Sequence, residues 1–183
     1  METMTDKNRK TEDSAVRTAD LPEMEKKEPV VQIRHVSKYF GKRKVVSDLT
    51  MTTYAGEVFG FLGPNGAGKT TTIKMLVGLI GIDEGRIAVC GQDVTRNFEK
   101  AMANVGAIVE NPEMYKYMTG MQNLMQYARM RKGVTKERIR QVVELVGLSK
   151  RIHEKVGKYS LGMRQRLGVA QALLHNPKVL ILD

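Results

Sequence analysis

The stretch GPNGAGKTT, Gly63 to Thr71, decides the fold of this chain. It follows the pattern G-x-x-x-x-G-K-[ST] and lies between an apolar segment and a segment with helical spacing, which is the context that this motif requires. A phosphate chain must come within hydrogen-bonding distance of several backbone N–H groups, so side chains must leave that space free. Gly63, Gly66 and Gly68 provide the space and permit a positive φ. The sequence therefore predicts a phosphate-binding loop between a buried strand and a helix.

The residues of this loop have separate roles in the prediction. The helix that begins at about Thr70 directs its N-terminal amides and its dipole at the anion. Lys69 reaches the β- and γ-phosphates, and the hydroxyl of Thr70 binds Mg²⁺. The alternative is a Pro-Asn-Gly turn that merely joins a strand to a helix, although a motif this long seldom arises by chance in a chain of 183 residues. The predicted nucleotide contacts are Gly63, Pro64, Asn65, Gly66, Ala67, Gly68, Lys69, Thr70 and Thr71.

A second motif, KVLILD, ends at Asp183. P-loop proteins place an Asp at the end of a second buried strand to hold Mg²⁺, at the edge where ligands gather in open α/β sheets. An apolar run that ends in Asp is a weak signal alone and a strong one as a companion to Lys69. We therefore expect Asp183 to lie beside the loop and to share the metal with Thr70. The interval between the two motifs exceeds that of a minimal P-loop domain, so an insert is expected.

Hydrophobic periodicity predicts the remaining elements. The segment EVFGFL, residues 57–62, is apolar on both faces and predicts a buried central strand. Alternation predicts strands within 30–36, 47–57, 85–93, 105–109 and 178–182, and helical spacing predicts helices within 118–133, 135–148 and 163–174. Thr135 is the expected N-cap of the second of these helices and Gly147 its expected stop. The pattern indicates a mostly parallel α/β core with a helical insert over about 113–158, after a disordered charged tail at 1–29.

Composition limits the classes of partner. The chain has 30 Lys and Arg against 20 Asp and Glu, a net charge of +10. Such a balance fits either a polyanionic partner or a solvated basic surface. No nucleic acid is expected, because the chain lacks both a run of basic residues and tryptophan. Cys90 is the only cysteine, which suits a reducing compartment. No apolar run approaches the ~18–20 residues of a membrane span, and the charged N-terminus lacks a secretory signal, so we expect a cytoplasmic protein.

From about residue 30 to residue 183 the chain resembles the ATP-binding subunit of an ABC transporter. GPNGAGKTT looks like the Walker A loop of that family, and KVLILD looks like its Walker B strand. SKYFGK, residues 37–42, resembles the loop whose aromatic side chain stacks on adenine. Phe40 matches that side chain better than Tyr39 because it directly precedes Gly41. The resemblance thus assigns adenine stacking to Phe40 and catalytic roles to Lys69 and Asp183.

The segment YSLGMRQR lies where the family has its signature loop. It departs from the usual L-S-G-G-Q and places Ser160, Leu161, Gly162 and Met163 at the matching positions. The resemblance implies that these four residues contact the γ-phosphate of a nucleotide bound to a second subunit. The alternative for Ser160 is an ordinary helix N-cap, which the sequence leaves open.

A second departure concerns the residue that follows the predicted strand at 105–109. The family usually has Gln there, and this chain has Glu110. A Glu at this place together with S-L-G-M is similar to the ATPases of bacitracin- and lantibiotic-resistance exporters. Because hard oxygen donors suit Mg²⁺, the resemblance makes Glu110 a metal ligand beside Thr70 and Asp183. A surface Glu before an Asn-Pro turn is the alternative.

The resemblance implies an α/β P-loop NTPase core with a helical insert over about 113–158, that is, an ABC nucleotide-binding domain at 30–183 without its C-terminal part. Two such domains would bind ATP and Mg²⁺ head to tail and drive a transmembrane permease, touched near Glu110 and residues 111–124. The subunit would then lie at the inner face of the cell membrane and power export of an antimicrobial peptide or drug.

The resemblance also implies that the chain is a fragment. Family members follow the Walker B Asp with a Glu that orients the attacking water and later with a switch His, and no residue of this chain matches either one. We expect the chain alone to bind ATP and Mg²⁺ weakly and not to hydrolyse ATP. Two other functions stay open: an ABC-type ATPase without a transport role, and a non-catalytic nucleotide-binding module.

Overall fold

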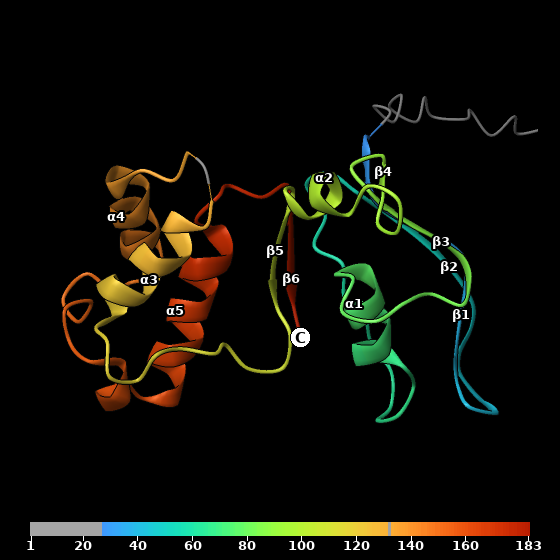
Figure 1. The fold of residues 1–183 in the computed structure, drawn as a ribbon, viewed down its shortest axis with the longest axis horizontal. Helices are drawn as coiled ribbons and strands as arrows, with labels where there is room; N and C mark the ends of the chain where they lie inside the picture. Colours follow the sequence, from blue (N-terminus) through green and yellow to red (C-terminus); the bar gives the residue numbers. More distant parts are fainter. Residues whose placement is uncertain (1–26, 132) are drawn as a thin grey trace, which may run out of the picture.

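A computed structural model describes residues 27–131 and 133–183 (Figure 1). Of the predicted disordered tail, residues 1–26 lie outside the described part. Pro29, which the prediction assigned to the tail, instead begins the first strand. No helix in the described part of the chain has both the length and the apolarity needed to cross a membrane.

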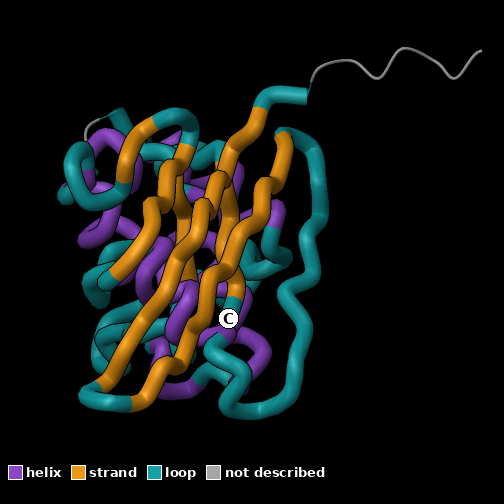
Figure 2. Tube along the Cα trace, turned by 90° about the vertical axis from the view of Figure 1, so that its right-hand side faces the viewer, coloured by secondary structure: helices purple, strands orange, loops and turns teal. Residues whose placement is uncertain are grey.

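Four strands form an antiparallel sheet in the order β2-β1-β3-β4 (Figure 2). They are β1 Pro29–Phe40, β2 Arg43–Tyr54, β3 Glu84–Val89 and β4 Gln92–Asp93. The chain reverses between β1 and β2 at Gly41, whose φ of +59° suits the short turns that join antiparallel strands. The predicted alternation along β1 is found only in part, because Val31 and Ile33 are buried around the half-buried Gln32, whereas Val30 is also buried and His35 is exposed.

The other two strands pair in parallel. β5 Val105–Ile108 lies beside β6 Val179–Leu182, with Val105 opposite Val179 and Ile108 opposite Leu182. The long helical segment between them is the kind of crossover that a parallel pair requires. In Figure 1 this pair stands between α1 on one side and α3, α4 and α5 on the other. The prediction of a mostly parallel core is therefore wrong for the described residues, since β5 and β6 are the parallel strands among them.

The predicted central strand at 57–62 is also wrong. The segment is a loop, and the side chains of Val58 and Leu62 are almost wholly exposed, at 103% and 90%. A strand must pair its backbone N–H and C=O groups with those of a neighbouring strand. Within the described residues neither sheet includes this segment, so its backbone has no partner strand there.

The predicted helices are found, α3 and α4 with shorter bounds and α5 with a start two residues earlier than predicted. They are α1 Lys69–Leu76, α3 Gly120–Arg129, α4 Lys136–Leu145 and α5 Leu161–Leu173. Thr135 caps α4 and Gly147 follows its end with a φ of +67°, as predicted. Thr119 and Gln122 form a capping box at the start of α3. The short helix α2 Phe98–Met102 and the 3₁₀ turn Val156–Lys158 were not predicted.

Two hydrophobic clusters hold these elements. One joins the antiparallel sheet, α1 and β5 through residues such as Ile33, Met75 and Val105. The other joins α3, α4 and α5 through residues such as Leu124, Val142 and Leu167. The second cluster reaches beyond the predicted insert at 113–158, because α5 supplies part of it. The boundaries of the insert stay a prediction.

Candidate nucleotide site

The glycine loop has the backbone conformation that its sequence predicts at two positions. Gly66 and Gly68 have φ values of +82° and +88°. Gly68 is also confined, because a Cβ there would lie 2.9 Å from the carbonyl oxygen of Val45 and 3.0 Å from a methyl group of Val46. Gly63 is different: its φ is not positive, and a Cβ there would make ordinary contacts.

The start of α1 presents amides without a side-chain cap. Gly68 is the N-cap residue, it offers no side chain, and the first turn contains no acidic residue. Such a helix start accepts an anion through its free N–H groups and its dipole. The ammonium of Lys69 donates hydrogen bonds to the carbonyl oxygens of Gly63 at 2.7 Å and Pro64 at 2.9 Å. The loop and the start of α1 therefore combine the positively charged side chain of Lys69 with several backbone N–H donors.

The structure brings Thr70 and Asp183 together. The Thr70 hydroxyl donates to Oδ1 of Asp183 at 3.3 Å, so α1 and the end of β6 meet at the loop. One hydroxyl and one carboxylate suit Mg²⁺, which takes one or two protein oxygens and completes its octahedron with phosphate oxygens and water. Within 27–131 and 133–183 no three His, Cys, Asp or Glu side chains gather into a metal site of their own. The donor set thus fits a metal that arrives with a phosphate ligand.

Glu110, the third predicted metal ligand, has another partner in this structure. It follows β5 with a φ of +65°, and its Oε1 lies 2.7 Å from the ammonium of Lys74. The hydrogen bond and charge of Lys74 lower the pKa of the Glu110 carboxyl. Sequence reasoning missed Lys74. Its position four residues after Thr70 puts both side chains on the same face of α1, but that spacing alone does not indicate a contact with Glu110.

The two aromatic candidates for adenine stacking differ in their surroundings. Phe40 ends β1, is 52% exposed, and has the Lys38 ammonium 5.6 Å from its ring centroid. Tyr39 donates its hydroxyl to Glu84 at 3.2 Å, and the Lys44 ammonium lies 5.3 Å from its ring. Phe40 therefore presents more free ring surface than Tyr39, although the adenine contact itself stays a prediction.

The predicted signature residues lie at the start of α5. Ser160 is the N-cap and accepts a hydrogen bond from the Met163 amide at 3.3 Å, so the N-cap interpretation is correct. Leu161 is 63% exposed, and a Cβ at Gly162 would meet nothing within 4 Å. Leu161 lines a cavity of about 220 Å³ beside Pro112, apart from Lys69 and Asp183. The structure does not bring these residues to the glycine loop of the same chain, and their contact with a nucleotide on a second subunit, which an N-cap role of Ser160 does not exclude, stays a prediction.

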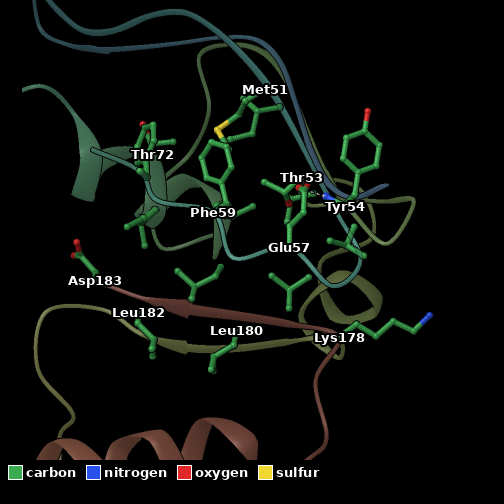
Figure 3. Close-up of a pocket in the computed structure, with 18 of the residues that line it drawn as sticks. Met51, Thr53, Tyr54, Glu57, Phe59, Thr72, Lys178, Leu180, Leu182 and Asp183 are labelled. Carbon is green, nitrogen blue, oxygen red and sulfur yellow. Dashed lines mark hydrogen bonds between the residues drawn. The ribbon is translucent and has the colours of Figure 1, made fainter. Parts of the chain in front are cut away.

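The cavity that touches Lys69 and Asp183 has a volume of about 360 Å³ and lies between α1, the β1–β2 hairpin and β6 (Figure 3). Its walls are mostly apolar, and Phe59 of the predicted strand points into it beside Met51 (Figure 3). None of the loop residues 63–68 lines it. It is therefore a gap in the apolar layer behind the loop and not a phosphate site.

Three features together define a P-loop nucleotide-binding domain: a glycine loop with two left-handed residues, uncapped amides at the start of α1, and a Thr–Asp contact at the end of the parallel strand β6. The family model for ABC transporters matches residues 46–183. The chain belongs to the ABC transporter family, and the matched part is its ATP-binding domain. The family inferred from the motifs is thus confirmed.

Named relatives agree with this assignment. The chain is 61% identical over 154 residues to the ABC transporter ATP-binding protein YhcH of Bacillus subtilis, covering 84% of this chain and 50% of that protein. It is 43% identical over 154 residues to the bacitracin transport ATP-binding protein BcrA of Bacillus licheniformis, again covering 84% and 50%. The similarity to bacitracin-resistance ATPases that Glu110 and S-L-G-M indicated is thereby confirmed. The chain spans about half the length of these curated relatives.

A solved structure supports the fold. The chain superposes on an ATP-binding subunit of an ABC transporter with a TM-score of 0.75 at 26% identity, covering 84% of this chain and 65% of that one. The predicted fold class, an α/β P-loop core with a helical part, is therefore confirmed, while the roles of individual site residues remain predictions.

Proposed function

We propose that this chain binds ATP together with Mg²⁺ at the Gly63–Thr71 loop, as a part of the ATP-hydrolysing subunit of an exporter for antimicrobial peptides or drugs. The observation that carries the proposal is the 3.3 Å contact between Thr70 and Asp183 at the uncapped start of α1. The contact supports the proposal because a hydroxyl and a carboxylate that could hold Mg²⁺ lie beside the loop that would bind the terminal phosphates. The similarity to BcrA, a bacitracin transport ATP-binding protein, supports an exporter.

Each residue of the proposed nucleotide site has a separate role. The amides at the start of α1 receive phosphate oxygens, and Lys69 transfers its hydrogen bonds from the carbonyls of Gly63 and Pro64 to the β- and γ-phosphates. Thr70 and Asp183 would hold Mg²⁺, which neutralises charge on the phosphates. Phe40 would support the adenine ring. Lys69 and the metal pair would stabilise charge while water attacks the γ-phosphate.

The proposal also includes two partners, a second nucleotide-binding subunit and a permease. Ser160–Met163 lies on a different surface from the glycine loop, which fits contact with a nucleotide on a second subunit arranged head to tail. The permease would dock on the loop after Glu110, where the rings of Tyr115 and Tyr117 are 50% and 69% exposed and 5.8 Å apart. Exposed aromatic side chains of this kind are enriched in interfaces. Docking there would place the domain at the inner face of the membrane.

Binding of a fluorescent ATP analogue to the 183-residue chain tests the nucleotide proposal. Lys69→Ala removes a charge-assisted contact and should weaken binding by about 10- to 100-fold. Asp183→Asn should weaken binding in Mg²⁺ and have little effect in EDTA, and the exposed Lys150→Ala should leave both affinities unchanged. Binding that is absent in the wild type, or equal in Lys69→Ala, would refute the proposal.

Hydrolysis is tested separately by phosphate release. We expect none from the 183-residue chain, because no described residue matches the Glu that orients water in the family. Phosphate release that Lys69→Ala abolishes would show that this expectation is wrong and that the chain carries its own catalytic base.

A further inference from the structure

Two polar contacts join α1 to the carboxyl ends of the parallel strands. Thr70 meets Asp183 after β6 at 3.3 Å, and Lys74 meets Glu110 after β5 at 2.7 Å. The two acidic residues follow the ends of neighbouring strands, because Ile108 pairs with Leu182 and the Asp183 amide donates to the Ile108 carbonyl at 3.0 Å. One face of a single helix thus holds both strand ends.

The Lys74–Glu110 contact is of a kind that breaks easily. The two side chains are 35% and 61% exposed, so water screens their attraction and the ion pair is weak. The backbone at Glu110 is held at φ +65°, a left-handed conformation that is unfavourable for a residue with a Cβ. Glu110 therefore combines an unfavourable backbone conformation with a weak side-chain contact.

We propose that Lys74 is a positioning residue that competes with nucleotide-bound Mg²⁺ for the carboxylate of Glu110. The inference rests on the proposed nucleotide site. Mg²⁺ holds its ligands at about 2.0–2.1 Å, so oxygens that share one ion lie within about 4 Å of each other. Lys74 is about 6 Å further along α1 than Thr70, and its ammonium would repel the metal. In the proposed exchange, the carboxylate of Glu110 leaves Lys74 when it joins Thr70 and Asp183 at the metal.

A change of partner at Glu110 would affect the loop that follows it and, through that loop, other parts of the domain. Two residues after Glu110, Pro112 packs so closely against α5 that a Cβ at Gly168 would lie 2.6 Å from it. The same loop carries the exposed rings of Tyr115 and Tyr117. When Glu110 leaves Lys74, the start of this loop moves, and both α5 and the proposed permease surface adjoin it.

The test is the Mg²⁺ dependence of nucleotide affinity, taken as the ratio of the dissociation constant in EDTA to that in Mg²⁺. Lys74→Met frees Glu110 and should raise this ratio about two- to fivefold, the size expected for a partly exposed ion pair. Loss of a positive charge also raises the ratio by itself, because free ATP carries more negative charge than its Mg²⁺ complex, and the Glu110→Gln background measures that part. Lys74→Arg keeps the ion pair and should restore the wild-type ratio, and the exposed Lys136→Met on α4 is the matched control.

A second comparison separates a positioning role from a structural one. In a Glu110→Gln background the competing carboxylate is gone, so Lys74→Met should raise the ratio less there than in the wild-type background. An unchanged ratio in Lys74→Met with normal binding would overturn the inference while leaving the proposed function intact. An equal rise in the Glu110→Gln background would overturn it too, since Lys74 would then act without Glu110. Failure of the wild type to bind nucleotide would overturn both proposals.

Discussion

Asn123 offers the sharpest test of how the loop after Glu110 is held. Its side chain is completely buried and makes three hydrogen bonds to the backbone. Oδ1 accepts from the Tyr115 amide at 2.9 Å, and Nδ2 donates to the carbonyls of Tyr115 at 3.1 Å and Thr119 at 3.0 Å. Asn123→Asp keeps the shape but replaces the donor of two bonds by an acceptor. Two buried carbonyls then face a carboxyl oxygen.

The magnitude follows from these contacts. Two lost hydrogen bonds cost about 1–3 kcal/mol. Burial also raises the pKa of the introduced carboxyl above its unfolded value of about 3.9, and each unit of the rise costs a further ~1.4 kcal/mol at neutral pH. We therefore expect Asn123→Asp to lower the free energy of unfolding by about 2–5 kcal/mol at pH 7. Because the folded pKa is the higher one, the deficit is largest above it and shrinks as the pH falls toward 4.

Urea unfolding at pH 7 and pH 5, followed by circular dichroism, measures both effects. The control is Asn111→Asp, which makes the same chemical change at an exposed residue and should stay within about 0.5 kcal/mol of the wild type. A deficit below 1 kcal/mol at pH 7 would refute the reasoning, because it would mean that the three hydrogen bonds do not hold Tyr115. A deficit that grows on acidification would contradict the assigned direction of the pKa change.

Three further predictions concern α5 and its contacts. Gly168→Ala puts a methyl group 2.6 Å from the Pro112 ring and should destabilise the chain by about 1–2 kcal/mol in urea unfolding, whereas Gly162→Ala, in open space on the same helix, should be neutral or stabilising. Arg138→Gln removes the guanidinium that donates to the carbonyl of Leu173 at 2.9 Å and should lower the melting temperature by about 2–6 °C, while Arg140→Gln on the same helix should not. Burial lowers the pKa of His175 below 6.5, so protonation favours unfolding and the free energy of unfolding should fall as the pH drops below that value. His175→Gln should reduce this dependence of stability on pH, whereas the exposed His153→Gln should not. Equal pH dependence in the two variants would contradict the assignment.

Local signals explain what the sequence could predict. Thr135 and Gly147 bound α4 as expected, because capping depends on the residues at the helix ends themselves. The glycine loop is equally local, since positive φ at Gly66 and Gly68 and the helix that follows are set by adjacent residues. The pairing of Thr70 with Asp183 required only the rule that ligands gather at the carboxyl ends of parallel strands.

Non-local partners explain what the sequence could not predict. The segment 57–62 has the apolar pattern of a buried strand, yet strand formation depends on a neighbour that no pattern within the segment can report. Glu110 has the right chemistry for Mg²⁺, but its partner Lys74 is 36 positions away and is recognised only when α1 is placed beside β5. The antiparallel sheet was missed for the same reason, because alternation predicts strands without their direction.

The manner in which α1 is attached bears on how the site would respond to a ligand. At its start, Gly68 is packed against Val45, so the glycine loop is fixed to the β1–β2 hairpin. Near its end, Met75 is fully buried in the cluster that also contains Val105 at the beginning of β5. The far ends of β5 and β6 meet α1 through polar side chains that solvent reaches. Since apolar burial resists displacement more than exposed polar contacts do, a ligand that changes those contacts should move the carboxyl ends of the strands while their beginnings stay in the core.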